Sequence, residues 1–474
     1  MSDSISAIVL AAGYGRRMRS EIPKVLHDCA GRPILAHVVD AVSSLAPGRT
    51  VVVVPPDHED IGAVMAAAGL DHVVYAVQPE VKGTADAARI GLAALEQDPG
   101  RVLILPGDHP LLESQTLTEI VGLATGSDAA AVVLSCRMHD PSGRGRIVRD
   151  GDGGLLRIVE DRDADEDERR IDEINGGIYV FDVGRLQRAI DKVDSENAQG
   201  EYYLTDVIEF LREEGETVLA HMTHGHDCFG VNSRTELSEA ARLLRQRTCD
   251  RLMDGGVTIV DPSTTYIDAG VQIEPDATIL PSTFLEGDTK VGSGAEIGPH
   301  ARIIDSTVEA GASVTYAVVR GSSIGPRATV GPFASLRPGT RLEADAHVGT
   351  FVETKKALVG EGSKVPHLSY VGDATIGRDV NVGAGTITCN WDGREKHETT
   401  IEDGAYISSD TMLVAPVRIG KKAATGAGSV VREDVPDGAL AVGVPARIIE
   451  GKGDRIKKTR PGNDGDTASR ENDD

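Results

Sequence analysis

The sequence predicts an α/β plus all-β protein, with a Rossmann-like N-terminal domain, a connecting helix and a C-terminal left-handed parallel β-helix of hexapeptide repeats. Two patterns predict it: apolar runs alternate with amphipathic stretches in the first half, and an aliphatic residue recurs every six positions in the second. The composition agrees, because the 474 residues include 54 glycines but only 3% aromatic residues. Glycine suits tight corners, and slim aliphatic side chains suit a narrow interior.

The first half is expected to form a doubly wound sheet. Strands are expected at 7–10, 50–54, 102–105 and 130–134, and helices at 33–45, 84–96 and 114–123. The strand segments are short and rich in β-branched residues, which is typical of buried parallel strands. Ligands of such sheets bind at the carboxyl ends of the strands.

The six-residue period begins after Met253. Inward-pointing aliphatic residues are expected at 267, 273, 279, 285, 291, 297 and 303, at 318, 324, 330, 336, 342 and 348, at 376 and 382, and at 401, 407, 413 and 419. This period fits neither a helix nor an ordinary strand and indicates a β-helix. Interruptions near 354–370 and 387–400 are expected to be insertions, where functional sites tend to lie.

The chain is therefore expected to contain four parts: a domain at 1–234, a linker helix at 235–253, the β-helix at 254–450 and a disordered tail at 451–474. The linker carries a narrow apolar stripe from Leu237 to Leu252. The tail lacks the repeat and is rich in charged and small residues, which favours disorder.

The charge and cysteine content exclude several classes of protein. A net charge of −25 is the opposite of what a nucleic-acid or anionic-membrane binder needs, so no nucleic-acid and no membrane partner is expected. Neither a membrane-spanning stretch nor a secretory signal is recognisable, so we expect a cytoplasmic protein. The five cysteines are scattered without a CxxC pair, which favours reduced thiols over disulfides or a zinc site.

A glycine-rich, basic segment follows the first expected strand. In LAAGYGRRMRSEIPKVL, Gly13 and Gly15 would let the backbone approach a phosphate chain, and Arg17 and Lys24 would supply positive charge. The spacing matches neither the dinucleotide motif GxGxxG nor the GxxxxGK[ST] loop, which disfavours a hydride-transfer enzyme or a P-loop ATPase.

As a whole, this segment resembles the signature of nucleotide-sugar pyrophosphorylases. The resemblance implies nucleotide and sugar contacts at Leu10, Ala11, Ala12, Gly13, Lys24, Gln78, Gly83, Thr84, Gly145, Glu160, Asn175 and Asn232. It also implies metal ligands at Asp108 and Asn232, whose hard oxygens suit Mg²⁺. Lys24 and Arg17 are expected to stabilise charge on a triphosphate as pyrophosphate leaves.

Polar and basic residues also gather where the hexapeptide period is interrupted. His367 lies in a loop near Arg337, Lys355, Tyr370 and Asn381, which together could seat an anionic sugar phosphate. The pKa typical of histidine suits a general base at neutral pH. A β-helix that serves only as a stalk for assembly is the alternative.

The stretches VETKKALVGEGSKVPHLSYVGD and NVGAGTITCNWDG resemble the family of bifunctional glucosamine-1-phosphate acetyltransferases and N-acetylglucosamine-1-phosphate uridyltransferases. The resemblance runs over nearly all of residues 5–450. It implies that His367 is the general base, that Arg337, Lys355, Tyr370 and Asn381 bind the amino-sugar phosphate, and that Ala384, Asn390, Trp391, Ser409 and Ala427 bind acetyl-CoA. Glu353 and Lys396 are further candidates, and the family usually has Tyr at the position of Trp391.

The function expected from this resemblance has two steps. The C-terminal domain acetylates glucosamine 1-phosphate with acetyl-CoA, and the N-terminal domain couples the product, N-acetylglucosamine 1-phosphate, to UTP with Mg²⁺. UDP-N-acetylglucosamine, a precursor of peptidoglycan and lipopolysaccharide, and pyrophosphate result. A homotrimer through the β-helix is also implied. Two alternatives stay open: a pyrophosphorylase of another sugar with a purely structural β-helix, and a non-catalytic sensor of nucleotide sugars.

Overall fold

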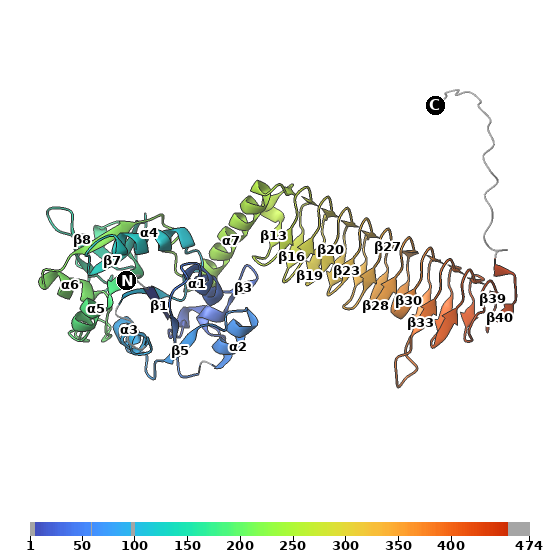
Figure 1. Cartoon of the computed structure of the whole chain (residues 1–474), viewed down its shortest axis with the longest axis horizontal. Helices are drawn as coiled ribbons and strands as arrows, with labels where there is room; N and C mark the ends of the chain where they lie inside the picture. The colour runs from blue at the N-terminus through green and yellow to red at the C-terminus, as the bar shows by residue number, and fades with distance from the viewer. Residues whose placement is uncertain (1–4, 58, 96–99, 454–474) are drawn as a thin grey trace, which may run out of the picture. The chain divides into compact units, whose positions relative to one another are not determined.

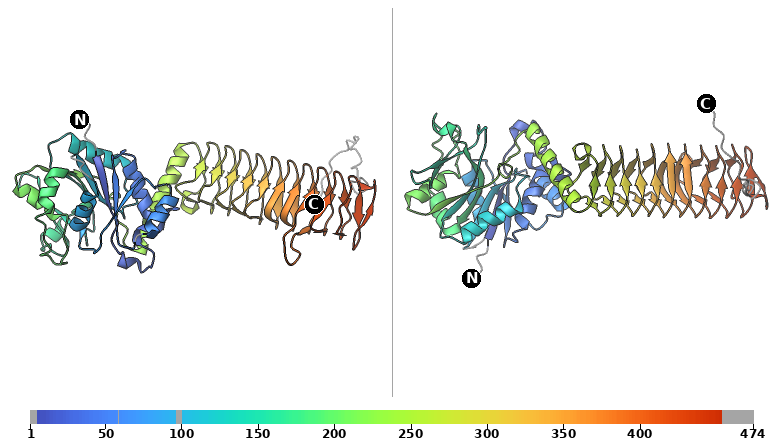
Figure 2. Two further views of the ribbon diagram at one scale, coloured as in Figure 1. Left: turned by 60° about the horizontal axis from the view of Figure 1, so that its bottom comes forward. Right: turned by 90° about the horizontal axis from the view of Figure 1, so that it is seen from above.

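The computed structural model describes residues 5–57, 59–95 and 100–453, and the chain divides into two compact units, Met1–Arg245 and Gln246–Asp474 (Figures 1 and 2). Helix α7 (Arg234–Asp254) begins in the first unit and ends in the second. The tail predicted to be disordered lies outside the described residues from position 454 onward. Among the described helices, none has the length and apolar character needed to cross a membrane.

The first unit is built on a mixed sheet in the order β11-β7-β10-β6-β1-β4-β5. Its strands are β1 (Ile5–Leu10), β4 (Thr50–Val54), β5 (Val74–Val77), β6 (Arg101–Pro106), β7 (Ala131–Arg137), β10 (Glu173–Asp182) and β11 (Val218–Met222). The strands expected from the sequence are confirmed. The sheet is not wholly parallel, however, because β10 runs antiparallel to both β6 and β7.

Helices cover both faces of this sheet. They are α1 (Ile34–Ser43), α2 (Glu59–Ala67), α3 (Thr84–Ala93), α4 (Ser114–Thr125), α5 (Val183–Ile190) and α6 (Asp206–Glu213). Successive residues of β1 point to opposite faces, so Val9 packs in the core with α1 and α4. Ile8 packs in the other core, with α3, α5 and α6. This is the doubly wound arrangement that the sequence predicts.

Small elements complete the unit. They are the hairpins β2 (Asp28–Cys29)–β3 (Arg32–Pro33) and β8 (Arg146–Arg149)–β9 (Leu155–Val159), and the 3-10 helices η1 (Arg16–Met18), η2 (Lys24–Leu26) and η3 (Glu168–Arg170). Strand β8 pairs with β10 through Arg146 and Ile174, which holds the second hairpin beside the sheet.

The second unit is a parallel β-helix (Figure 2). One sheet contains β12 (Thr258–Ile259), β15 (Thr278–Ile279), β18 (Glu296–Ile297), β21 (Ser313–Val314), β24 (Thr329–Val330), β27 (His347–Thr350), β29 (Lys364–His367), β31 (Asn381–Val382), β34 (Tyr406–Ile407), β37 (Ala424–Thr425), β39 (Leu440–Val442) and β40 (Arg447–Ile449). Each strand up to β25 pairs with the third strand after it along the chain, as expected for coils with three faces. Tyr266 thus lies beside Phe284, three hexapeptides later.

The strands of the other two faces form one continuous sheet. They are β13 (Tyr266–Ile267), β14 (Gln272–Ile273), β16 (Phe284–Glu286), β17 (Lys290–Val291), β19 (Arg302–Ile304), β20 (Thr307–Val308), β22 (Val318–Arg320), β23 (Ser323–Ile324), β25 (Ser335–Leu336), β26 (Arg341–Leu342), β28 (Glu353–Val359), β30 (Tyr370–Ile376), β32 (Ile387–Cys389), β33 (Thr399–Ile401), β35 (Met412–Val414), β36 (Val417–Ile419) and β38 (Val430–Val431). The short helix η4 (Pro262–Thr264) precedes β13.

The predicted inward column is confirmed with one error. Val318, expected to point inward, is half-buried, and its neighbour Val319 is fully buried between Ile303 and Leu336. The reason is the length of this coil. Arg302 pairs with Val318 one coil later, so the coil contains fewer residues than three hexapeptides. A five-residue step shifts the inward position by one residue. Ile273, in β14 of the first coil, is only partly buried.

Both ends of the β-helix are covered by other structure. Cys249 and Leu252 of α7 belong to the same apolar core as the first coils. At the other end β40 folds back antiparallel onto β39, with Leu440 opposite Ile449 and Val442 opposite Arg447. The core of the coils is therefore closed at its start by α7. At the other end β39, the last parallel strand of one face, is paired with β40.

The corrected register can be tested by unfolding. Val319→Ala should lower the free energy of unfolding of the β-helix by about 2 kcal/mol, because it leaves a cavity in a column that cannot collapse. Val318→Ala removes the same atoms from a half-buried position and should cost less than about 1 kcal/mol. Denaturant titrations of both variants would measure the difference, and equal losses would contradict the register.

Candidate functional site: a nucleotide pocket and a surface on the β-helix

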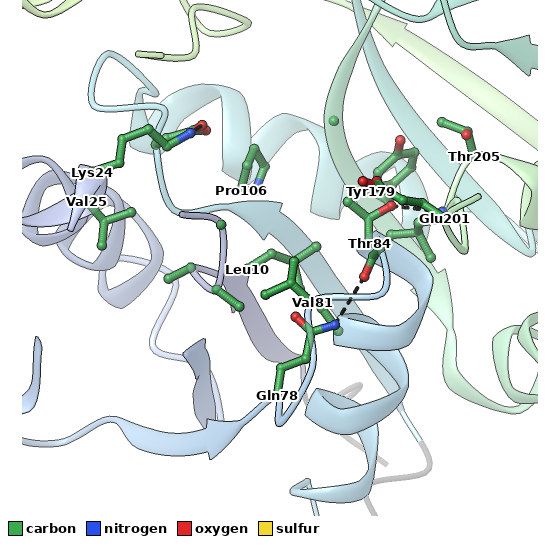
Figure 3. A pocket seen from close by; sticks show the side chains of 18 of the residues that line it. Leu10, Lys24, Val25, Gln78, Val81, Thr84, Pro106, Tyr179, Glu201 and Thr205 are labelled. Atoms are coloured by element: carbon green, nitrogen blue, oxygen red, sulfur yellow. Dashed lines mark hydrogen bonds and ion pairs between the residues drawn. The ribbon is translucent and has the colours of Figure 1, made fainter. Parts of the chain in front are cut away.

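The first unit contains a cavity of about 440 Å³ at the carboxyl ends of β1 and β6 (Figure 3). Residues that line it are Leu10, Ala11, Ala12, Gly13, Lys24, Val25, Gln78, Val81, Gly83, Thr84, Ala87, Pro106, Asp108, Glu160, Asn175, Gly177, Tyr179, Glu201, Leu204 and Thr205. Lys24 and Tyr179 come from opposite sides of the cavity, with Leu10 and Pro106 between them. Its volume suits a ligand of the size of a nucleotide.

A buried ion pair lies at one end of this cavity. The ammonium Nζ of Lys24 donates to Asp108 Oδ2 and, over 3.0 Å, to Asn232 Oδ1. Burial by itself raises the pKa of Asp108, but Lys24 and the neighbouring His109 outweigh it and hold that pKa well below its usual range. Asp108 is therefore a carboxylate throughout the physiological range of pH. Lys24 is the only cationic side chain among the lining residues.

The oxygen atoms of Asp108 and Asn232 fit the chemistry of a magnesium site. Both lie against the same cationic atom, Lys24 Nζ, which shows that they converge on one point. In the described part of the chain there is no group of three or more His, Cys, Asp or Glu side chains that could form a protein-only metal site. A site with two protein oxygens is typical of Mg²⁺ that is completed by substrate phosphates and water.

The wall near β5 is held by a loop that requires glycine. Gly83 has a φ of 123°, and a Cβ at this position would meet the backbone of Tyr202. Ala85 N donates to Tyr202 O (2.9 Å), and Tyr202 N donates to Lys82 O (2.8 Å). Leu204 N also donates to Thr84 Oγ1 (3.0 Å). These bonds bring the segment before α6 onto the pocket.

The opposite wall carries the residues expected to bind a sugar. Asn175 Nδ2 donates to the hydroxyl of Tyr179 (2.6 Å), and Thr205 Oγ1 donates to Glu160 Oε1 (3.3 Å). Burial raises the pKa of Glu160, an effect that the Thr205 hydroxyl partly offsets. A Cβ on Gly145 would lie 3.5 Å from Glu160 Oε1, so Gly145 adjoins this wall without lining the cavity.

The structure thus brings together nearly all of the predicted nucleotide and sugar contacts. Gly145 and Asn232 lie next to the lining residues, and Asn232 reaches Lys24. Arg17 belongs to η1, is exposed and is not among the residues that line the cavity. Its predicted catalytic role therefore has no support from this geometry.

Sequence reasoning missed Tyr179 and Thr205, whose hydroxyl groups hydrogen-bond to residues expected to bind a sugar, and the neighbouring Glu201. Thr205 directly precedes α6, a position where polar residues are common as helix caps. That position could have drawn attention to it. Tyr179 lies within β10, where an aromatic residue usually signals only core packing.

The second predicted site lies on the surface of the β-helix. Arg337 Nη1 donates to Glu353 Oε1 (2.8 Å), and Glu353 lies beside Tyr370 in the pairing of β28 with β30. Contact with the ammonium of Lys396 lowers the pKa of Lys355. Two exposed ammonium groups in contact form a site that an anion would stabilise.

The hairpin between β32 and β33 supplies the other side of this cluster, and it protrudes from the β-helix in Figure 1. Asn390 Nδ2 donates to Asp373 Oδ2 (2.5 Å) and to the Tyr370 hydroxyl (3.4 Å). Trp391 pairs with Lys396 across the hairpin and is 57% exposed. Asp373, which fixes Asn390, is a residue that the sequence analysis did not single out.

Other predicted acetyltransferase residues lie on different parts of the coils. His367 ends β29 and is exposed, and Asn381 lies in β31 of the same sheet. A corner at Leu368, whose φ is positive, lies between His367 in one sheet and Tyr370 in the other. Ala384, Ser409 and Ala427 occupy three stacked corners further along.

The same corner carries a row of rings on earlier coils. We call His300, Tyr316, Phe333 and Phe351 the ring ladder; their centroids are 5.1, 5.5 and 5.5 Å apart in turn. Each member has a positive φ, as does Leu368 on the next coil. This conformation costs roughly 1–2 kcal/mol for a residue other than glycine. Phe333 and Phe351 are nevertheless more than half exposed.

The fold and the pocket together define a nucleotidyltransferase domain that is followed by a hexapeptide β-helix. In agreement, residues 7–252 match the family of MobA-like NTP transferase domains. The chain is 47% identical to "Bifunctional protein GlmU" of Streptomyces avermitilis over 462 residues, covering 96% of this chain and 95% of that protein. The chain belongs to the GlmU family of bifunctional enzymes.

Two further relatives extend over a similar length. "Bifunctional protein GlmU" of Thermoanaerobacter pseudethanolicus is 44% identical over 461 residues, which cover 97% of this chain and all of that protein. The protein of the same name from Heliobacterium modesticaldum is 47% identical over 438 residues, 92% of this chain and 95% of that protein. These matches confirm the predicted bifunctional enzyme and its nucleotidyltransferase domain.

A solved structure is also similar to part of the chain. It is a putative glucose-1-phosphate thymidylyltransferase from Bacillus anthracis in complex with a sucrose, and it is 20% identical with a TM-score of 0.43. The similarity covers 51% of this chain and 95% of that one.

The acidic side of the pocket should make stability depend on pH. Burial and the nearby Glu160 raise the pKa of Asp206 from 3.8 to about 6. Because the folded-state pKa is the higher one, the native state binds more protons in this range and loses stability as the pH rises through it. Asp206→Asn should therefore stabilise the protein by about 1 kcal/mol at about pH 8, and by less at about pH 5. Urea unfolding at both pH values would measure this, and an advantage independent of pH would contradict it.

Proposed function

We propose that this enzyme makes UDP-N-acetylglucosamine in two steps. The β-helix transfers an acetyl group from acetyl-CoA to the amine of glucosamine 1-phosphate, and the first unit then joins the product to UTP and releases pyrophosphate. The observation that carries the proposal is the contact of Lys24 with Asp108 and Asn232, at one end of a cavity that Gln78 and Glu160 also line. A cytoplasmic location is part of the proposal, because UTP and acetyl-CoA are metabolites of that compartment.

The order in which the lining residues follow one another along the cavity suits uridylyl transfer. Gln78 and Gly83 would hold the base, Lys24 the phosphates, and Glu160 with Asn175 the sugar. An oxygen of the sugar phosphate forms a bond to the α-phosphorus of UTP while the bond to the β-phosphate oxygen breaks. Two anions must approach each other in this step, so Lys24 aligns them and offsets their charge. Mg²⁺ held by Asp108 and Asn232 would further neutralise the phosphates.

The β-helix surface suits acetyl transfer. Arg337 and Lys355 would bind the phosphate, with Tyr370 and Asn381 against the sugar, and Asn390, Trp391 and the stacked corners against acetyl-CoA. His367 would take a proton as the amine attacks the thioester carbonyl carbon. The carbon–sulfur bond then breaks, and the proton passes to the leaving thiolate to give free coenzyme A.

We further propose that three chains assemble through the β-helix. His367 lies next to the corner at Leu368, where a neighbouring copy would complete the acetyltransferase site. The ring ladder leads along that corner to Leu368, and its exposed rings are held in a costly conformation. Burial against identical ladders would offset this cost, since apolar area stabilises by about 25 cal/mol per Å².

The two steps can be separated with purified protein, glucosamine 1-phosphate, acetyl-CoA, UTP and Mg²⁺. Release of the coenzyme A thiol and formation of UDP-sugar should both occur, and omission of acetyl-CoA should abolish the UDP-sugar. Formation of UDP-sugar from N-acetylglucosamine 1-phosphate without any thiol release from glucosamine 1-phosphate would reduce the β-helix to a scaffold.

Two variants serve as controls for each other. Lys24→Ala should lower kcat/KM for UDP-sugar formation by about 100-fold or more, because the only cation of the pocket lining is lost, and should leave thiol release unchanged. His367→Ala should lower thiol release by about 100-fold or more and spare uridylyl transfer from supplied N-acetylglucosamine 1-phosphate. Loss of both activities in either variant would argue against two independent sites.

The role of the ring ladder can be tested by assembly. Phe333→Asp places a charge among the exposed rings and should convert the trimer into monomers, with loss of acetyl transfer only. Leu156→Asp, at an exposed apolar residue of the first unit, is the control and should remain trimeric. Light scattering would give the masses, and a Phe333→Asp protein that stays trimeric would exclude the ladder as the interface.

A further inference from the structure

Gln78 follows β5 directly and is almost fully buried in the pocket wall. Its backbone N–H donates to Val54 O (2.9 Å), which fixes the start of its side chain between β4 and β5. The side chain is 1% exposed, and its amide end points toward Val81 and Thr84 (Figure 3). In a buried position each amide group must find a partner, so the orientation of the amide decides what the pocket offers a ligand.

Two acceptors fix that orientation. Gln78 Nε2 donates to Asp86 Oδ2 (2.8 Å) and to the backbone oxygen of Gly83 (3.4 Å). Both partners are oxygens that only accept, so a rotated amide would place its own oxygen against them. All hydrogen bonds of this side chain within the described residues are made by Nε2, which leaves Oε1 to face the cavity.

Asp86 is itself held in place. It lies in the first turn of α3, where the helix dipole favours a negative charge. Its other oxygen, Oδ1, lies 4.0 Å from Arg89 Nη1, one turn further along the helix. One carboxylate oxygen therefore faces a cation and the other faces Gln78.

We infer that Asp86 is a positioning residue that sets base selectivity: it turns the Gln78 amide so that the nucleotide site offers a hydrogen-bond acceptor and selects a base with an imino N–H. Uracil has this N–H at N3, whereas cytosine has an acceptor at the same atom. Cytosine would place two acceptors against each other in a buried site, which is strongly disfavoured. Discrimination of about 10- to 100-fold follows. The inference rests on the proposed uridylyl transfer.

Asp86→Ala tests this by freeing the amide to rotate. The ratio of kcat/KM for UTP to that for CTP should fall by about 10-fold or more, through weaker use of UTP and stronger use of CTP, with the KM for the sugar phosphate unchanged. Asp86→Asn keeps an acceptor oxygen and should restore most of the ratio. Asp60→Ala removes a first-turn aspartate of α2, outside the cavity, and should match the parent protein.

A readout without turnover completes the test. Calorimetric titration with UMP and with CMP should show the same loss of discrimination in Asp86→Ala. Parent-like selectivity in Asp86→Ala, by turnover or by binding, would overturn the inference while leaving uridylyl transfer intact. Absence of any UDP-sugar from the parent protein would instead overturn the proposed function.

Discussion

The buried contact of Lys24 with Asp108 and Asn232 is the interaction on which the nucleotide site depends. It joins three segments, the loop after β1, the end of β6 and the start of α7, that are far apart in the sequence. Without Lys24 the buried Asp108 carboxylate would keep only its contact with His109, at a cost of several kcal/mol. The same ammonium is the only cationic group among the residues that line the cavity. Structure and chemistry therefore rely on one side chain, and a protein with a net charge of −25 offers an anion few other places to bind.

The period of the sequence predicted the fold because each half buries its apolar residues at a regular interval. Strands β1, β4, β6 and β7 fall where β-branched runs occur, and the inward column of the β-helix follows the six-residue spacing. Val318 was placed wrongly because a fixed period carries no information on a coil shortened by two residues. The antiparallel direction of β10 was also out of reach, since a buried strand has the same composition in either direction.

The candidate site was predictable where a motif is local. Gly13 and Lys24 belong to one short signature, and the cavity contains both. Tyr179 and Thr205 were missed because they act through Asn175 and Glu160 across the fold. Arg17 has the right charge in the right segment, yet it is exposed and does not line the cavity. Sequence spacing cannot tell which of several neighbouring cations faces inward.

The antiparallel return of β40 onto β39 has a consequence for the protein in solution. A stack of parallel coils ends in a strand whose free N–H and C=O groups could continue the ladder with another molecule. At this end the molecule pairs one such strand with its own chain, in the opposite direction, so the parallel repeat cannot simply be extended there. The start is covered by α7, whose Cys249 and Leu252 close the core. The two covered ends thereby prevent the coils of one molecule from continuing into those of another and forming a fibre.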